Sequence, residues 1–251
     1  MAEQGTDPIR QFAVEPIIAW HPFGIDVSFT NASLFMVLVV VAVCFLMFVG
    51  TSRRSIVPGR LQSAAEMSYE FVASTVRLTG GTAGMQFFPL IFTIFMFVLF
   101  CNLFGLLPFS FSITSQIAVT FALAIMVIGL VIGIGLYRHG LRFLKVFVPS
   151  GVSPILLPFI VLVEIVSFAT RPISLSVRLF ANMLAGHITL KVMAGFVATL
   201  LGAGLAAIIA PIPLVATVVL MAFELLVAVL QAYVFAILSC VYLNDAIHPG
   251  H

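Results

Sequence analysis

Long apolar runs separated by short polar segments dominate the chain. Three of these runs, Ala32–Gly50, Phe87–Leu107 and Ser115–Tyr137, contain no Asp, Glu, Lys, Arg or His. Each is long enough to cross a bilayer, which takes about 20 apolar residues in a helix. We therefore expect three uncharged helices that form a membrane scaffold.

A mixed segment, Arg60–Leu78, separates the first two runs. It alternates apolar side chains with Gln62, Glu66, Glu70 and Arg77. This pattern is typical of an amphipathic helix that lies at the membrane surface. An ordinary helix in a loop fits the same pattern, and the sequence does not decide between the two.

Two much longer apolar runs follow, Pro154–Leu201 and Leu205–Tyr242. As continuous helices they would be roughly 72 Å and roughly 57 Å long, whereas the hydrocarbon core is only about 30 Å thick. We expect two long, strongly tilted helices, with Pro172 as a candidate kink in the first. Hydropathy alone leaves an extra pair of spans open.

The predicted fold is therefore an all-α polytopic membrane protein with about five membrane helices plus one surface amphipathic helix. We expect a single membrane domain over residues 1–251. Within it, residues 1–30 form a polar tail, residues 31–145 the scaffold helices, and residues 150–245 an ion-translocating helix pair.

Composition narrows the class further. Hydrophobic residues make up 62% of the chain and charged residues 8%, with a formal net charge of +2. Soluble domains carry roughly 25% charged residues, and a nucleic-acid binder needs a basic surface. These values exclude a soluble enzyme, a disordered chain and a nucleic-acid-binding protein. The three cysteines lie in apolar runs without pairing motifs, so we expect neither disulfides nor a metal site.

Basic residues predict the orientation. They follow the first and third spans, as Arg53, Arg54, Arg60, Arg138, Arg142 and Lys145. The positive-inside rule then places the N-terminus outside and the C-terminus in the cytoplasm. The N-terminal segment lacks the features of a signal peptide or of an organelle presequence. We expect a multi-pass protein of the bacterial inner membrane, and an organelle inner membrane is the less favoured alternative.

Ionisable side chains at membrane depth are confined to the two long runs. They are Glu164, Arg171, Arg178, His187, Lys191 and Glu224. With His187 neutral, these residues sum to one excess positive charge. An uncompensated Arg such as Arg178 costs at least about 2.5–3.5 kcal/mol at the centre of a bilayer. We therefore expect a partner subunit to supply a carboxylate; the simpler alternative is a set of structural ion pairs between the two helices.

Three segments carry specific motifs: SLSVRLFANMLAGH at Ser174–His187, NLFGLLP at Asn102–Pro108, and the run Phe223–Leu243. Together with the order of spans, they make the chain resemble subunit a of the F-type ATP synthase membrane sector over nearly its whole length. The resemblance implies a stator subunit whose partners are the c-subunit ring, b-type peripheral stalk subunits, the rest of the ATP synthase and the lipid bilayer, without nucleic acid. It implies no cofactor and no catalytic or metal-binding residue, so the chain is not an enzyme by itself.

The resemblance also implies roles for particular residues. The family's rotor-facing Arg matches Arg178, and its neighbouring polar residues match Asn182 and Gln231. Its cytoplasmic carboxylate matches Glu164, with Ser167 nearby, and a polar position near the end of the last helix matches Tyr242. Its outer Glu/His pair matches His187 and Glu224, in exchanged order relative to some members. Two offset half-channels would pass protons to and from rotor carboxylates.

Two other classes compete with this interpretation. A self-contained transporter or antiporter would keep its ionisable pair within its own bundle, often with inverted repeats, and no repeat is visible. A cofactor-binding subunit of a respiratory complex would need several histidines for haem, and His187 is the only one inside a predicted span. Proton and sodium coupling remain open, because in this family the choice is thought to depend largely on the ring.

Overall fold

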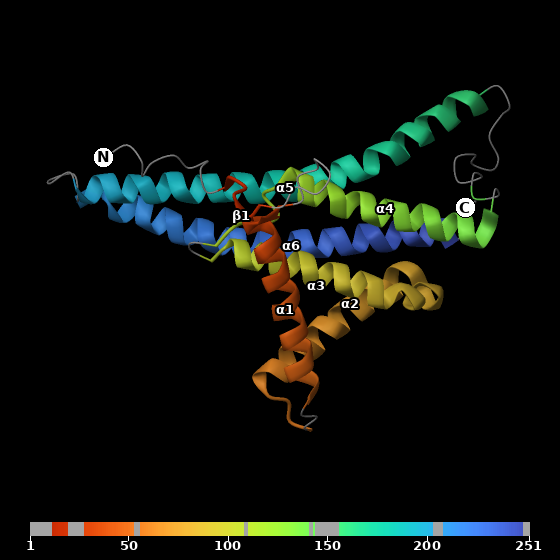
Figure 1. Cartoon of the computed structure of the whole chain (residues 1–251), viewed down its shortest axis with the longest axis horizontal. Helices are drawn as coiled ribbons and strands as arrows, with labels where there is room; N and C mark the ends of the chain where they lie inside the picture. The colour runs from red at the N-terminus through yellow and green to blue at the C-terminus, as the bar shows by residue number, and fades with distance from the viewer. Residues whose placement is uncertain are drawn as a thin grey trace. The chain divides into compact units, whose positions relative to one another are not determined.

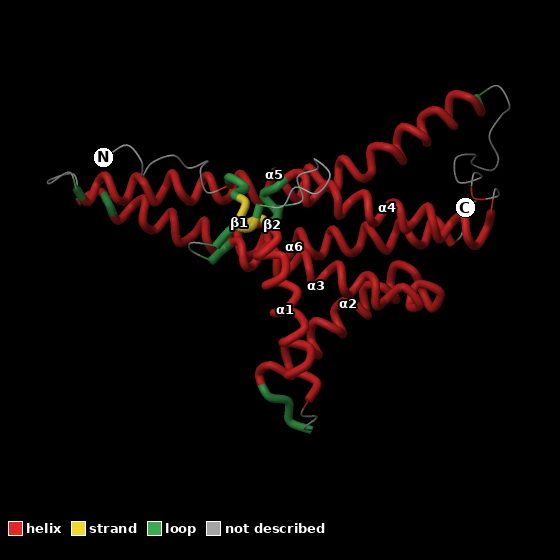
Figure 2. The backbone as a smooth tube through the Cα atoms, in the orientation of Figure 1, coloured by secondary structure: helices red, strands yellow, loops and turns green. Residues whose placement is uncertain are grey.

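The computed structural model describes residues 12–19, 28–52, 56–107, 110–140, 143, 156–202 and 208–247. Helices make up nearly all of this part of the chain, as Figure 2 shows in red. Among the described residues, five helices are long and apolar enough to cross a membrane. The predicted all-α class with about five membrane helices is confirmed.

The three scaffold runs form helices close to their predicted positions (Figure 1). They are α1 at Asn31–Ser52, α3 at Phe88–Gly105, which follows the short 3-10 helix η3 at Met85–Phe87, and α4 at Ile117–His139. Helix α4 continues two residues beyond the predicted end. It stops where Gly140 adopts a φ of 54°, a left-handed conformation that commonly terminates helices.

Each long run is one continuous helix, as predicted. Helix α5 covers Leu157–Leu201 with Pro172 inside it, and α6 covers Pro211–Ile247. Helix α6 begins later than the predicted Leu205, and two prolines occupy its first turn, where a missing backbone N–H leaves no hydrogen bond unmade. It also ends five residues beyond Tyr242, so Asp245 belongs to the helix.

Helix α2 covers Arg60–Gly84, so it extends beyond Leu78, the predicted end of the amphipathic segment. The helix is interrupted at Gly81, which has a φ of 59° and a ψ of −154°. Glycine adopts this conformation without the steric penalty that a Cβ atom would bring. The location of α2 at the membrane surface stays a prediction.

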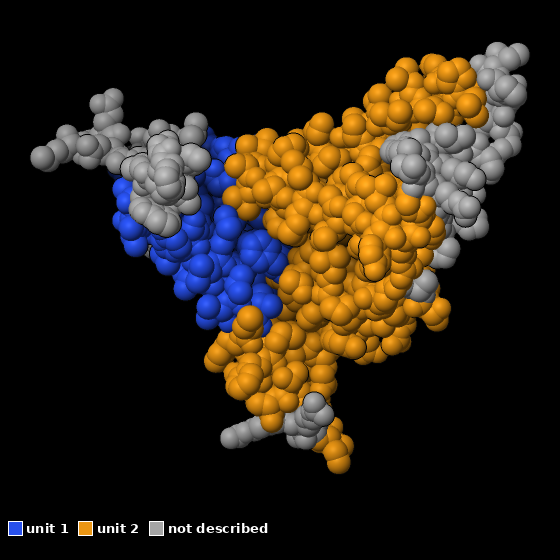
Figure 3. All heavy atoms as spheres, turned by 45° about the vertical axis from the view of Figure 1, so that its right-hand side comes forward, with its two compact units in different colours: residues 1–43, 97–116, 179–231 blue, residues 44–96, 117–178, 232–251 orange. Residues whose placement is uncertain are grey.

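The chain divides into two compact units, coloured blue and orange in Figure 3. Unit 1 contains residues 1–43, 97–116 and 179–231, and unit 2 contains residues 44–96, 117–178 and 232–251. Helices α5 and α6 therefore contribute to both units. The division into scaffold helices and an ion-translocating helix pair is a functional one, and it stays a prediction.

In unit 1 a short N-terminal segment is fastened to the start of α1. Strands β1 (Pro16–Ile18) and β2 (Phe29–Thr30) pair in antiparallel fashion. The Asn31 carboxamide accepts hydrogen bonds from the backbone N–H groups of Ala32 and Glu15, at 2.8 and 3.2 Å. It also donates to the carbonyl of Ala13 at 3.0 Å. This segment belongs to the tail for which the sequence indicated no role.

Unit 1 has a core in which α3 and α6 are joined by a polar contact. The fully buried Asn102 on α3 donates from Nδ2 to the carbonyl oxygen of Ala228 on α6, at 3.0 Å. Met183 of α5 and Ala228 are fully buried in the same unit. The hydrogen bond joins α3 to α6 in the unit that contains the polar groups described next.

Candidate functional site

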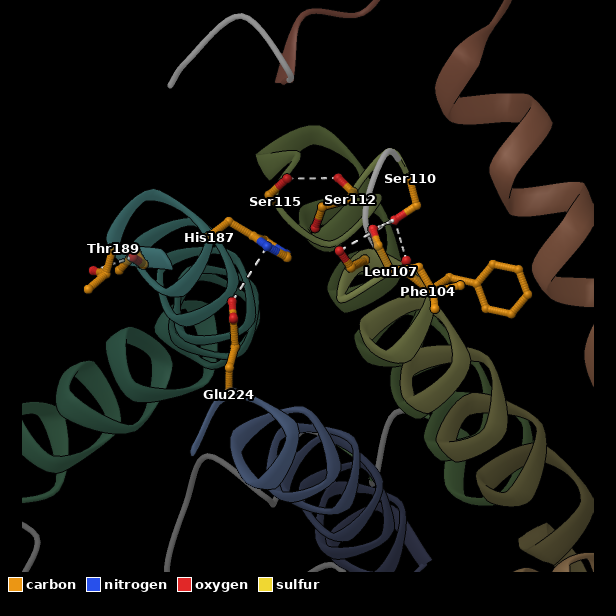
Figure 4. A network of polar contacts seen from close by, with 10 residues as sticks. Phe104, Leu107, Ser110, Ser112, Ser115, His187, Thr189 and Glu224 are labelled. Carbon is orange, nitrogen blue, oxygen red and sulfur yellow. Dashed lines mark hydrogen bonds and ion pairs between the residues drawn. The ribbon is translucent and has the colours of Figure 1, made fainter. Parts of the chain in front are cut away.

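In unit 1 the structure brings together the predicted His187–Glu224 pair. His187 comes from α5 and Glu224 from α6, and their side chains point toward one another in Figure 4. Nδ1 of His187 lies 3.5 Å from Oε1 of Glu224, and the two residues are only 9% and 4% exposed. The pair is thus close enough for electrostatic interaction while shielded from bulk solvent.

Gly186 explains how the carboxylate comes so close to α5. A Cβ atom at this position would lie 2.5 Å from Oε1 of Glu224, well inside van der Waals contact. The carboxylate therefore packs directly against the backbone of α5. Only glycine next to His187 leaves room for this approach.

Two cavities in unit 1 border this pair. One, of about 400 Å³, is lined by Asn182, Glu224 and Gln231. The other, of about 640 Å³, is lined by His187 and by Lys191, which is exposed one helical turn later on α5. Asn182, Glu224 and Gln231 therefore line one cavity, and His187 lines the other.

Several buried polar atoms around the pair have no hydrogen-bond partner within the described part of the chain. They are Nε2 of His187, both carboxylate oxygens of Glu224, and Oγ of Ser112. An unpaired polar group in a dry interior is costly, whereas polar, roomy sites are the ones that hold water. These groups are therefore of the kind that ordered water can satisfy.

Unit 2 contains a second cluster, centred on Arg171 of α5. Its guanidinium lies 3.6 Å from Oε1 of Glu164 and 3.3 Å from Oδ2 of Asp245. It also lies over the rings of Phe168 and Tyr242, at 5.3 and 4.9 Å from their centroids. The structure thus brings two predicted residues, Glu164 and Tyr242, to one arginine.

Asp245 is a carboxylate beside Arg171 that was not among the predicted site residues, because the last predicted apolar run ends at Tyr242. Helix α6 continues to Ile247, and Oδ2 of Asp245 lies 3.3 Å from Nη1 of Arg171. Arg171 therefore has two carboxylate partners, Glu164 and Asp245. The spacing offered a signal, because Asp245 is three residues after Tyr242 and therefore lies near the same helix face.

Arg178 is exposed on α5 and forms no hydrogen bond or ion pair with any residue that the structure describes. Ser174, one turn earlier, and Ser167 are also exposed. Asn182, one turn after Arg178, is exposed as well. Arg178 is therefore not compensated within the described chain, and in a membrane its charge needs a partner from elsewhere.

Residues beyond those predicted from the sequence complete the two clusters. Gly186 admits Glu224, Asp245 pairs with Arg171, and Ser112 faces the cavity of His187. The two cavities and the buried carboxylate allow reversible proton transfer between side chains and water. The Arg171 cluster can hold carboxylates in place, but a guanidinium does not give up its own proton.

The comparisons with known proteins agree with one another. The sequence model of the ATP synthase A chain family matches residues 33–244. ATP synthase subunit a of Beijerinckia indica subsp. indica is 63% identical over 246 residues, covering 98% of this chain and 97% of that protein. ATP synthase subunit a of Chelativorans sp. is 60% identical over 247 residues, covering 98% of this chain and 99% of that protein. ATP synthase subunit a of Bartonella tribocorum is 55% identical over 252 residues, covering 100% of both chains.

Proposed function

The chain belongs to the ATP synthase A chain family, and from this premise we propose that it forms two offset aqueous half-channels that carry protons to and from carboxylates of a rotating c-subunit ring. Membership makes it a component of the ATP synthase membrane sector. Its bacterial relatives and five apolar helices support a multi-pass protein of the bacterial inner membrane. The family also argues against a self-contained antiporter and a haem-binding subunit.

One observation carries the proposal: the buried His187–Glu224 pair lines two cavities and has unpartnered polar atoms. An imidazole gains and loses a proton near physiological pH. A proton from the cavity of about 640 Å³ passes to His187, then to Glu224, and enters the cavity of about 400 Å³. Asn182 and Gln231 line that cavity and orient the water that continues toward the rotor.

Arg178 acts at the meeting point with the rotor. Its exposure and lack of a partner in the described chain support a role toward another subunit. Its fixed positive charge favours the ionised form of an approaching rotor carboxylate. Because the guanidinium keeps its proton, it also blocks a direct leak between the half-channels.

The Arg171 cluster belongs to the second half-channel, on the cytoplasmic side. Arg171 orients Glu164 and lies over Tyr242, so the carboxylate is held in one place while partly exposed. A proton released from the rotor passes Glu164, with the exposed Ser167 nearby. In this orientation the N-terminus is outside and the C-terminus is cytoplasmic, in accordance with the basic residues after the first and third spans.

The proton-motive force turns this pathway into rotation. A protonated rotor carboxylate crosses lipid at low cost, whereas an ionised one does not. The ring therefore rotates from one half-channel to the other while neutral, driven by about 2.3 kcal/mol per charge per 100 mV of membrane potential. The chain acts as a stator, held by peripheral-stalk subunits of the b type, and the nucleotide chemistry belongs to other subunits.

The test is a Glu224→Gln variant in membranes that contain the assembled complex. Gln keeps the shape of the side chain but neither takes up nor releases a proton. We expect passive proton conduction, measured with the catalytic head removed, to fall by about 10²-fold, with normal copurification of the subunits. The matched control is Glu70→Gln, an exposed Glu on α2. Wild-type conduction in Glu224→Gln would overturn the proposal.

A further inference from the structure

Ser112 lies in the segment between α3 and α4, in unit 1, and is buried with 5% exposure. Its hydroxyl has no hydrogen-bond partner among the residues that the structure describes. The nearby Ser115 differs, because its hydroxyl donates to the carbonyl of Ser112 at 2.7 Å. A buried hydroxyl that stabilises nothing by hydrogen bonding is unusual in a folded protein, so a functional explanation is warranted.

The Ser112 hydroxyl approaches His187 where Gly105 leaves space between them. A Cβ atom on Gly105 would lie 3.0 Å from Oγ of Ser112 and 3.3 Å from Nε2 of His187. Both polar atoms therefore converge on the same side of Gly105. Figure 4 shows the His187 ring pointing from α5 toward the segment that carries Ser112.

The two nitrogens of His187 face different groups. Nδ1 lies 3.5 Å from Glu224, whereas Nε2 is the unpartnered nitrogen near Gly105. Ser112 and His187 line the same cavity, which does not include Glu224 among its lining residues. The order of groups is therefore cavity and Ser112 hydroxyl, then Nε2, then Nδ1, then the carboxylate of Glu224.

We propose that Ser112 is a further proton-pathway residue, which delivers protons from the cavity that it shares with His187 to Nε2 of His187. A hydronium ion in the cavity gives a proton to the hydroxyl oxygen of Ser112 while the hydroxyl's own proton passes, through one bridging water, to Nε2 of His187. Ser112 is again a neutral hydroxyl after this step, and the imidazolium then releases its Nδ1 proton to the Glu224 carboxylate. Rotation of the hydroxyl and return of His187 to the tautomer protonated on Nδ1 reset the relay. This inference rests on the proposed function and adds one residue to its outer half-channel.

A substitution of Ser112 is suited to the test, because the lost hydroxyl makes no hydrogen bond in the described chain. Ser112→Ala is therefore expected to leave assembly intact. Thr114→Val is the matched control: Thr114 is fully buried and its hydroxyl is also unpartnered among the described residues. It does not line the cavity of His187.

The readout is passive proton conduction through the assembled membrane sector with the catalytic head removed. We expect Ser112→Ala to lower conduction by about tenfold, which is less than the roughly 10²–10⁴-fold that acid–base groups contribute, and we expect Ser112→Thr, which restores a hydroxyl, to recover it. Thr114→Val should conduct like the wild type. The ratio of rates in H₂O and D₂O should also change in Ser112→Ala, which loss of packing alone would not cause.

Wild-type conduction in Ser112→Ala would overturn the inference, as would an equal loss in Thr114→Val. The Glu224→Gln variant separates the two proposals. If Glu224→Gln blocks conduction while Ser112→Ala conducts normally, only the role of Ser112 fails. If Glu224→Gln conducts normally, the proposed function fails, because the carboxylate that accepts the proton from His187 is then not needed.

Discussion

The two polar clusters use similar residues on the same two helices, but they are built in opposite ways. In unit 1, His187 and Glu224 are almost fully buried, lie 3.5 Å apart and border two cavities. In unit 2, Arg171 contacts two carboxylates and two aromatic rings, and its side chain is 19% exposed. The first cluster contains buried polar atoms without a hydrogen-bond partner in the described chain, whereas the arginine of the second cluster has ionic and aromatic partners.

This difference separates two tasks of a charged cluster in a membrane protein. Groups that relay protons must be able to change partners, so free lone pairs and adjacent space are useful. Groups that hold a structure are best satisfied on all sides. We therefore expect substitutions in unit 1 to change conduction more than stability, and substitutions at Arg171 to change stability first.

Among substitutions that leave every ionisable group in place, Gly186→Ala should produce the largest effect. The added Cβ would lie 2.5 Å from Oε1 of Glu224 and 3.0 Å from its carboxyl carbon, so the carboxylate must move away from His187. We expect passive proton conduction to fall by at least about tenfold, with little change in stability, because the atoms that must move are the end of a flexible side chain.

Gly195→Ala on the same helix is the control for this variant. A Cβ there would meet no atom within 4 Å, and alanine stabilises a helix by roughly 0.5–1 kcal/mol relative to glycine. Equal conduction by the two variants would show that close approach of Glu224 to α5 is not needed.

Arg171→Ala should have an intermediate effect, on stability. It leaves the carboxylates of Glu164 and Asp245 without their cation, at side-chain exposures of 31% and 42%. Because these groups are partly exposed, we expect a loss of about 1–2 kcal/mol. Thermal unfolding of the purified membrane sector measures it.

Asp245→Asn, which removes only one of the two anions, should cost less than Arg171→Ala, about 0.5–1 kcal/mol. A loss of conduction by Arg171→Ala without a change in unfolding temperature would contradict the structural role of Arg171.

Thr120→Val should have the smallest effect. The hydroxyl of Thr120 on α4 lies 3.1 Å from that of Ser176 on α5, and both residues are fully buried in unit 2. Breaking this contact should cost about 1 kcal/mol and leave proton conduction unchanged. A conduction defect would indicate that the pathway includes the α4–α5 contact.

The sequence predicted the helices well, because apolar runs of sufficient length leave few alternatives in a membrane. It missed Asp245 because Asn244 and Asp245 resemble the polar end of a span, although α6 continues through them. It also missed Ser112 and Gly186. Gly186 matters because Glu224 of another helix lies against it, and Ser112 matters because it lies near Gly105 and His187. Such contacts join segments far apart in the sequence, so the residue pattern of one segment does not predict them.

For Arg178, the charge count and the family resemblance lead us to expect a partner from another subunit, and the structure leaves Arg178 exposed on α5. The helical pattern alone does not predict this exposure. Periodicity identifies which residues share a helix face. It does not say whether that face meets the same chain or another subunit.

The most direct test of the account is Arg178→Ala in membranes where assembly is confirmed by copurification. Arg77→Ala, an exposed arginine on α2, is the matched control. ATP-driven proton pumping is recorded first, and passive proton leak is then recorded with the catalytic head removed. The account predicts that Arg178→Ala abolishes pumping and raises the leak, while Arg77→Ala behaves like the wild type. Normal pumping by Arg178→Ala would contradict the account and assign Arg178 a structural role only.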